Sequence, residues 1–426
     1  MSQAFVAVLA TMDTKVGEAR FLRDELAGHG LPARMVDTGL RRDCRSADGD
    51  VSSAEVARAS GYELAHLREH TRRDRAMAAM ADGARALLRG WRAEGLLLGV
   101  IAVGGNQGTA IATAAMRELP YGLPKVMVST VACGNVRGYV EDSDITMMFS
   151  VGDLLGGPNE VTGPVLRRAA AALAGMAAVR DRPWPADPGS AGRPVAATAF
   201  GNTHAAVTTA AARLEAAGCR TVAFHASGAC GSAMERLIDE GVFAGVLDLT
   251  THELLGELEP ADIYAPVRPG RLTAAGRRSL PQVIAPGGLE YFCFGAEDTI
   301  PARLRGRAIH HHNPRNTNVR TSADELAAVA GLLAARANAA RGPTVVLVPL
   351  RGWSEVGSPG GVLHDPVANA EFVRVLRARL DPSVEFHELD MTINDSRFGA
   401  AAADVLLGAL GVGSSSVEQP PEVGQA

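Results

Sequence analysis

The chain has 426 residues, of which 47% are hydrophobic, and this length is enough for two or three domains that each bury a core. Its formal net charge of -5 provides no basic field, which argues against a nucleic-acid-binding protein that relies on phosphate neutralisation. The five cysteines form no Cys-x-x-Cys pair, and neither a membrane-spanning apolar run nor a secretory signal is evident, so we expect a cytoplasmic protein with no membrane contact and a small-molecule substrate.

The first half of the chain alternates short apolar runs with Ala-rich segments. Strands are predicted at FVAVL, LLLGVIAV, KVMVS and ITMMF, and helices at VGEARFLRDELAG, GTAIATAAMREL and VTGPVLRRAAAALAGMAAV. Continuous rather than alternating hydrophobicity is typical of parallel strands that are covered on both faces. The predicted fold class is therefore α/β, with an N-terminal domain over residues 1–180.

A proline-rich stretch over residues 181–194 predicts a linker between two domains. The strands predicted after it are VAATAF, TVAFH, GVLDL, PQVIA, TVVLVPL and VEFHEL. One following helix is expected to open with a Ser322-x-x-Glu325 capping box, and another with Pro366 in its first turn. We expect a second α/β domain over residues 195–412 and a frayed polar tail over residues 413–426.

The two halves resemble each other at a constant offset of 189 residues. Without a gap, the segment that starts at residue 6 aligns with the segment that starts at residue 195, and each reads as strand, polar turn, helix, strand and polar Gly turn. Ala-rich sequence can produce such a match by chance, but the aligned polar turns are hard to explain in that way. The pattern predicts two mainly parallel sheets related as a pseudo-repeat.

Polar loops that follow the predicted strands of the first half are candidates for a ligand crevice. We expect the loop GGNQGT to wrap an anionic group at the start of a helix that begins near Thr109, because backbone N–H groups face outward there. The alternative is a purely structural turn. The predicted cofactor-binding residues are Thr11, Asp13, Thr14, Lys15, Gly104, Gly105, Asn106, Gln107, Gly108, Thr109, Ser129 and Thr130.

Charged residues add to this hypothesis. Lys15 and Lys125 are the only lysines among 42 basic residues, and both are predicted to lie beside the crevice, although two lysines could fall there by accident. The carboxylates that could hold Mg²⁺ with a nucleotide are Asp13, Glu141, Asp142, Asp144 and Asp153.

Three consecutive histidines, His310, His311 and His312, suggest a metal site at first sight. On an extended strand only His310 and His312 would point to the same side, and no Asp, Glu or Cys partner lies at ligand spacing. We interpret this segment as polar lining of a crevice or as an interface turn, and expect no protein-bound metal centre.

Several segments together resemble uncharacterised protein family 0261. They are ATMDTK, the GGxxGT loop, PKVMVST, SDITMMFSVGD, HASGACGSAME, LDLTTHEL, QVIAPGG, HHNPRNTNVRT, LVPLRGWS and ELDMTINDSRF. That family is similar to the N-terminal domain of the tomato mosaic virus resistance protein. The resemblance covers about residues 4–410 and implies two Rossmann-like domains, ATP binding and homodimerisation.

Two functional hypotheses follow from these patterns. The first is a nucleotide-binding protein, with ATP as the ligand and Mg²⁺ as its counter-ion, that can be an ATP-using enzyme. The second is a nucleotide-independent hydrolase or lyase for a small carbonyl compound, in which Cys133 or Cys230 is the nucleophile and His204 or His225 the base. A pair of N–H groups in a Gly turn would form its oxyanion site.

Overall fold

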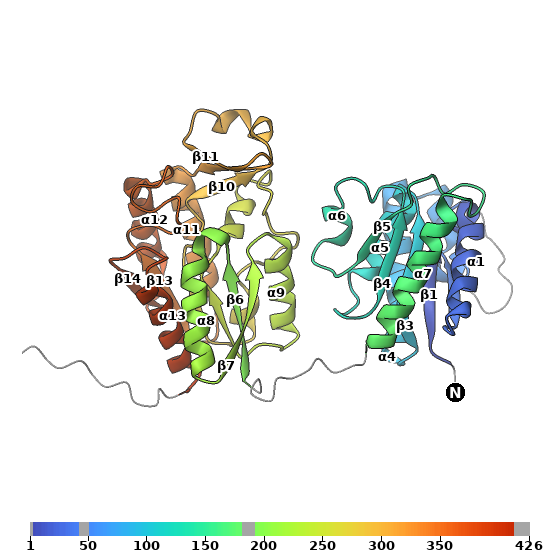
Figure 1. The fold of residues 1–426 in the computed structure, drawn as a ribbon, viewed down its shortest axis with the longest axis horizontal. Helices are drawn as coiled ribbons and strands as arrows, with labels where there is room; N and C mark the ends of the chain where they lie inside the picture. Colours follow the sequence, from blue (N-terminus) through green and yellow to red (C-terminus); the bar gives the residue numbers. More distant parts are fainter. Residues whose placement is uncertain (1–2, 42–50, 181–191, 413–426) are drawn as a thin grey trace, which may run out of the picture. The chain divides into compact units, whose positions relative to one another are not determined.

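The computed structural model describes residues 3–41, 51–180 and 192–412, in two compact units, Met1–Trp184 and Pro185–Ala426. Cys44, most of the predicted linker and the predicted tail lie outside the described residues. Each unit is a mixed α/β structure with a mainly parallel sheet, as predicted from the continuous apolar runs (Figure 1). Among the described residues, no helix has both the length and the apolar character needed to cross a membrane.

The N-terminal unit is built on a five-stranded parallel sheet with the order β2-β1-β3-β4-β5. All four strands predicted for this half are present, and β2 joins them at the edge. The strands are β1 (Phe5–Ala10), β2 (Ala33–Asp37), β3 (Leu97–Gly104), β4 (Lys125–Ser129) and β5 (Thr146–Phe149).

Helices cover both faces of this sheet (Figure 1). One face is covered by α1 (Met12–Gly28) and α7 (Thr162–Val179). The other is covered by α2 (Ser53–Ala59), α3 (Leu64–Glu69), α4 (Arg73–Ala93) and α5 (Asn106–Met116), and the short α6 (Arg137–Val140) packs near α5. In β1, Val6 and Val8 join the first core while Ala7 and Leu9 join the second, which is why the strand is apolar throughout.

The C-terminal unit contains a six-stranded parallel sheet with the order β14-β13-β9-β8-β6-β7. Its strands are β6 (Arg193–Ala199), β7 (Cys219–His225), β8 (Gly245–Asp248), β9 (Gln282–Ile284), β13 (Thr344–Pro349) and β14 (Glu385–Leu389). Read from β7, this order repeats that of the N-terminal sheet and adds one strand. Because β1 ends at Ala10 and β6 at Ala199, 189 positions later, the predicted pseudo-repeat is confirmed at the level of topology.

Helices also cover both faces of the second sheet. One face carries α8 (His204–Ala216) and α13 (Ser396–Ala409), and the other carries α9 (Ala229–Asp239), α10 (Ala274–Arg277), α11 (Ala323–Asn338) and α12 (Pro366–Arg379). The predicted capping box opens α11, and Pro366 begins α12. Short 3₁₀ helices are η1 (Gly201–Thr203), η2 (His252–Glu257), η3 (Glu297–Thr299) and η4 (Ala302–Leu304).

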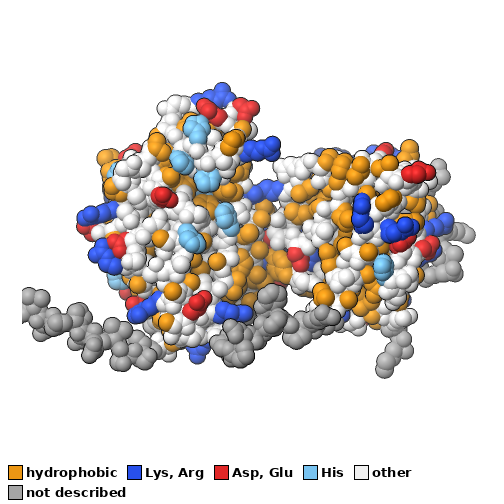
Figure 2. Space-filling view, in the orientation of Figure 1, with side chains coloured by type: hydrophobic (Ala, Val, Ile, Leu, Met, Phe, Trp, Pro, Cys, Tyr) orange, Lys and Arg blue, Asp and Glu red, His pale blue; other side chains and the backbone are white. Residues whose placement is uncertain are grey.

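An antiparallel three-stranded sheet, which the sequence did not predict, completes the C-terminal unit. It consists of β10 (Tyr291–Phe294), β11 (Ile309–Asn313) and β12 (Asn316–Arg320) in the order β10-β12-β11. The three histidines lie on β11, and the rings of His310 and His312 face each other at 6.2 Å, as strand alternation predicts. Figure 2 shows several histidines gathered on the visible face of this unit. In the part of the chain that the structure describes, no group of three His, Cys, Asp or Glu residues could hold a metal ion.

Candidate functional site

The N-terminal sheet has its topological switch point between β1 and β3, because β2 lies on one side of β1 and the later strands lie on the other. Loops that leave two such strands diverge, and ligands of doubly wound proteins bind between them. Ala10 pairs with Val103 at the carboxyl ends of β1 and β3. The ATMDTK and GGNQGT segments therefore lie next to each other at the carboxyl edge of the sheet.

The Gly-rich turn connects β3 to α5, which begins at Asn106, three residues earlier than expected. Gly105 is the N-cap and no side chain caps the helix. Glycine is required at position 104, where a Cβ would lie 2.9 Å from the Cα of Gly108. Gly105 has φ of -81° and an open side, since a Cβ placed there would have the Thr130 hydroxyl as its nearest neighbour, at 3.6 Å. The turn thus brings an uncapped helix start to the crevice.

The two bulky side chains of this turn are held at its flanks. The Gln107 side-chain carbonyl accepts a hydrogen bond from Arg73 on α4 at 2.7 Å, and Asn106 accepts one from the Tyr139 hydroxyl at 3.3 Å. Arg73 was not among the predicted site residues, and it is 34 positions away from Gln107. The only sequence feature that marks it is a run of charged residues at the start of a helix. The contact places a guanidinium group beside the first turn of α5.

Two predicted hydroxyl groups are used inside the protein. Thr109 is buried, and its hydroxyl donates to the Gly105 carbonyl at 2.8 Å and lies 2.7 Å from the hydroxyl of Ser129. Ser129 also accepts a hydrogen bond from the Val131 N–H group. Thr109 was expected to offer its hydroxyl to a ligand, but its position at the fourth residue of α5 directs it back into the turn. Thr130 differs, since its hydroxyl makes no hydrogen bond to any described residue.

The turn after β1 lies beside the Gly-rich turn at the same edge of the sheet. The hydroxyls of Thr11 and Thr14 lie 3.3 Å apart, and the Asp13 carboxylate accepts a hydrogen bond from the Arg41 N–H group at 3.0 Å. Lys15 is partly exposed and forms no ion pair with a described residue. An ammonium group without a described partner therefore lies within one turn of the start of α1.

Lys125 does not lie beside the crevice. It is the first residue of β4 and so sits at the amino end of the sheet, where it is buried and pairs with Asp144 at 2.6 Å. Glu141 and Asp142 also precede β5 and bind Arg117 and Tyr121 respectively. The expectation that Lys125 lies beside the carboxyl-edge loops was wrong. A strand can carry polar residues at either end, and Lys125 lies at the amino end of β4. Of the five suggested Mg²⁺ ligands, only Asp13 and Asp153 follow a strand.

The four residues suggested as catalytic are divided between the two units. Cys133 is exposed in the loop after β4 of the N-terminal unit, and Cys230 lies in the first turn of α9 in the C-terminal unit. His204 is exposed at the start of α8 and contacts Thr208. His225, at the end of β7, lies at a pocket of the C-terminal unit, where partial burial lowers its pKa.

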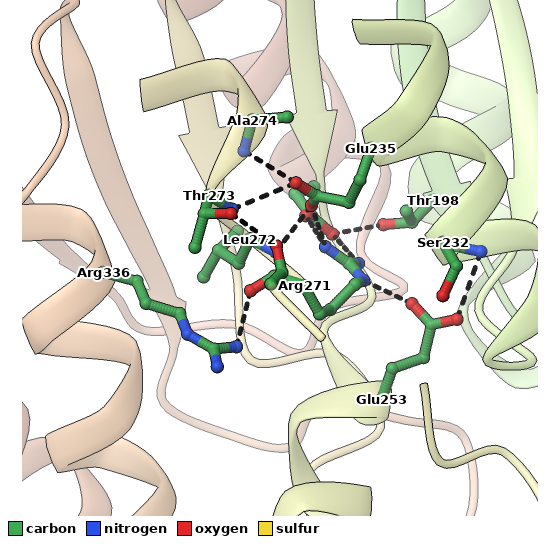
Figure 3. Close-up of polar contacts among 12 residues, drawn as sticks. Thr198, Ser232, Glu235, Glu253, Arg271, Leu272, Thr273, Ala274 and Arg336 are labelled. Atoms are coloured by element: carbon green, nitrogen blue, oxygen red, sulfur yellow. Dashed lines mark hydrogen bonds and ion pairs between the residues drawn. The ribbon is translucent and has the colours of Figure 1, made fainter. Parts of the chain in front are cut away.

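The second Gly-rich turn, HASGACGS, already binds an anion from the protein itself. The Glu253 carboxylate accepts hydrogen bonds from the N–H groups of Gly228 and Gly231 at the start of α9, and it also pairs with the buried Arg271 (Figure 3). A Cβ on Gly231 would overlap the Glu253 carboxylate. Asp248 binds the same guanidinium group in bidentate fashion. The N–H pair that could have served as an oxyanion site is thus occupied by a structural carboxylate.

The fold defines a two-domain, Rossmann-like protein with a Gly-rich turn at a topological switch point of its N-terminal sheet. The chain belongs to the Uncharacterised protein family (UPF0261), whose N-terminal domain matches residues 4–182 and whose C-terminal domain matches residues 193–410.

Relatives of this chain occur in bacteria and plants. The UPF0261 protein of Clostridium tetani is 34% identical over 404 residues, which cover 94% of this chain and 98% of that protein. A UPF0261 protein of Rhizobium meliloti is 38% identical over 399 residues, covering 93% and 97%. The ToMV resistance protein Tm-1(GCR237) of Solanum lycopersicum is 33% identical over 425 residues, which cover 94% of this chain but 55% of the tomato protein.

Proposed function

We propose that the N-terminal domain binds the phosphate groups of a nucleotide at the start of α5, with ATP as the ligand that the family resemblance implies. The observation that carries the proposal is the uncapped amino end of α5 at the switch point between β1 and β3. Backbone N–H groups and the helix dipole at such an end favour a bound anion. The function is therefore nucleotide binding, for an enzyme that uses ATP on a small molecule.

Three side chains support this site. Lys15 supplies an ammonium group that suits a phosphate oxygen approached end-on, and Arg73 retains further N–H donors beside its bond to Gln107. The Thr130 hydroxyl faces the open side of Gly105. Together these groups would offer positive charge and hydrogen-bond donors from three different elements to a phosphate at this edge of the sheet.

The side chains of Asn106 and Gln107 in the turn are compatible with this ligand. Because Arg73 holds the Gln107 amide against α4, the amide does not lie over Gly105. Bound ATP would supply an activated phosphoryl group, while the chain's own residues bind and orient the phosphates. Asp13 belongs to a turn of the same crevice and is the carboxylate that would hold Mg²⁺.

Titration calorimetry of the whole protein with ATP, ADP and inorganic phosphate tests the proposal. A Gly105→Val substitution adds a branched side chain on the open side of the turn, where it obstructs a phosphate but meets little protein. We expect the affinity for the tightest of these ligands to fall by about tenfold or more, equivalent to roughly 1.4 kcal/mol.

A matched control is Gly90→Ala, at a helical position where a Cβ would meet no atom within 4 Å. This variant should bind like the wild-type protein. Lys15→Gln should weaken ATP more than inorganic phosphate if the ammonium group contacts the outer phosphates. Equal affinities of wild-type protein and Gly105→Val would show that the turn is structural and would refute the proposal.

A further inference from the structure

A separate pocket lies in the C-terminal unit, between the carboxyl edge of its parallel sheet and the antiparallel sheet. Its volume is about 190 Å³. Asn202 and His225 line it from the ends of β6 and β7, and Tyr291, Cys293 and Asn318 line it from β10 and β12. Pockets for drug-sized ligands hold roughly 300–1,000 Å³, so this one matches a small metabolite.

Cys293 is held in this pocket by polar groups rather than by apolar packing alone. Its sulfur accepts a hydrogen bond from the Asn318 amide at 3.1 Å, and its N–H group donates to the Asp262 carboxylate at 2.8 Å. The same carboxylate lies 3.3 Å from Nε2 of the buried His252. A thiol with an amide donor, a histidine and a carboxylate around it is an arrangement that packing does not require.

The hydrogen bonds of His252 define its charge. Nδ1 lies 2.8 Å from the Gly288 carbonyl, and Nε2 faces the Asp262 carboxylate, so both ring nitrogens face acceptors and both must carry a proton. Burial disfavours this charge, but the neighbouring Asp262 carboxylate opposes that effect, and the pKa of His252 is raised well above its ordinary value. Burial raises the pKa of the Cys293 thiol, which therefore keeps its proton at neutral pH.

The pocket also contains a hydrogen-bonding group without a partner. The Tyr291 side chain is 1% exposed, and its oxygen accepts a hydrogen bond from the Asn202 amide at 2.6 Å. Neither the phenol proton nor the buried side-chain oxygen of Asn202 has a partner among the described residues. Rotating the amide by 180° would pair the phenol proton but leave the NH₂ group unpaired. Either orientation leaves one buried O–H or N–H donor without a partner. Burial raises the pKa of the Tyr291 phenol, which therefore keeps its proton.

We propose that this pocket binds a small aldehyde or ketone and that the Cys293 thiol adds to its carbonyl carbon. The carbonyl oxygen would accept a hydrogen bond from the Tyr291–Asn202 pair. In the addition, the S–H bond breaks, an S–C bond forms, and the carbonyl π electrons move to oxygen, which takes the proton released by sulfur. The product is a hemithioacetal, so the step needs no oxidant, reductant or co-reactant.

His225 provides a route for this proton. It lies at the mouth of the same pocket, in ring contact with Phe200 and Tyr264 at 5.2 and 5.8 Å. Partial burial lowers its pKa, which keeps the ring neutral at pH 7 and able to accept a proton. The doubly protonated His252 cannot act in this way, and we assign it to holding the cysteine in place.

Alkylation of the whole protein by iodoacetamide, followed by peptide mass spectrometry, measures the reactivity of each cysteine separately. Glycolaldehyde should slow the alkylation of Cys293 by about tenfold, the size of effect expected for an addition favoured by roughly 1.4 kcal/mol in the pocket. The exposed Cys133 reports aldehyde addition to an ordinary thiol in the same sample and should be little affected. Ethylene glycol, which has no carbonyl group, should protect neither cysteine.

Three results would overturn the proposal. Glycolaldehyde could protect Cys293 no better than Cys133, or ethylene glycol could protect it equally well, which would indicate occlusion without addition. Cys293 could also react no faster than Cys219, which is buried in a hydrophobic core, and this would show that small electrophiles do not enter the pocket.

Substitution of the phenol tests the carbonyl contact. Tyr291→Phe should require about tenfold more glycolaldehyde for the same protection of Cys293, the cost of one hydrogen bond, while alkylation without aldehyde continues. Tyr62→Phe, at an exposed position of the N-terminal unit, is the matched control and should behave like the wild-type protein. Unchanged protection in Tyr291→Phe would refute the role of the phenol as the carbonyl donor.

Discussion

Individual residues at the carboxyl edge of the N-terminal sheet can lower the stability of the protein in ways that the local sequence does not reveal. Asp37, at the end of β2, is 2% exposed and accepts hydrogen bonds from the N–H groups of Met12 and Gly39. Burial raises its pKa to about 6, although these two hydrogen bonds lower it. A carboxylate whose pKa is raised on folding destabilises the protein once the pH exceeds the unfolded value.

Asp37→Asn should therefore stabilise the N-terminal unit in a pH-dependent manner. The folded protein binds more protons than the unfolded chain between about pH 4 and pH 6, so wild-type stability falls there as the pH rises. From pH 4 to pH 6, the free energy of unfolding of the variant should rise by about 3 kcal/mol relative to that of the wild-type protein, because two pKa units correspond to roughly that energy. Urea unfolding monitored by hydrogen exchange of the β1 peptide measures this difference.

Asp24→Asn is the control for this experiment, since its side chain is 69% exposed. Its stability difference from wild type should stay flat over the same pH range. A flat difference for Asp37→Asn as well would mean that the Asp37 carboxyl titrates normally in the folded protein.

At the scale of elements, α9 begins where it does because a carboxylate from another segment caps it. Arg271, which is fully buried, pairs with Glu253 and Asp248 and also lies 3.3 Å from Glu235 (Figure 3). Burial raises the pKa of Glu235, while Arg271 opposes that effect. Removing Arg271 would leave these buried carboxylates without their counter-charge, which typically costs about 3–5 kcal/mol, roughly a third of a domain's stability.

We expect Gly231→Ala to destabilise the C-terminal unit by about 3 kcal/mol, at the upper end of overpacking costs, because the added methyl group meets Glu253. Gly408→Ala, at a helical position of α13 with no neighbour within 4 Å, should be neutral or stabilise by roughly 0.5 kcal/mol. Urea unfolding monitored through the peptides of α9 compares them. Equal stabilities of the two variants would contradict the close contact between Gly231 and Glu253.

For the whole molecule, the family resemblance implies a homodimer, and the Ala-rich helices with only 4% aromatic residues suit close packing between chains. We expect sedimentation equilibrium at micromolar concentration to give about 89 kDa, twice the chain mass of 44.3 kDa. A mass near 44 kDa that persists at higher concentration would exclude a stable dimer. ATP can be added to the same samples, which shows whether association and nucleotide binding are linked.

Continuous apolar runs predicted the central parallel strands, because a strand buried on both faces needs apolar residues throughout. The offset of 189 residues likewise predicted that the two sheets are related as a pseudo-repeat. The antiparallel sheet escaped prediction, since HHHN and NTNVR are polar and are buried only where β12 pairs with both of its neighbours.

What the sequence by itself determined is the two-domain α/β fold and a Gly-rich turn that leads into a helix, because both depend on local patterns of period and composition. Only the tertiary structure decided which end of a strand a polar residue occupies, as the burial of Lys125 with Asp144 shows. It also decided that Glu253 fills the second Gly-rich turn, and that Cys293 joins His252 and Asp262. These contacts join segments 19 to 41 positions apart, and the crossovers that bring them together leave no periodic signal in the chain.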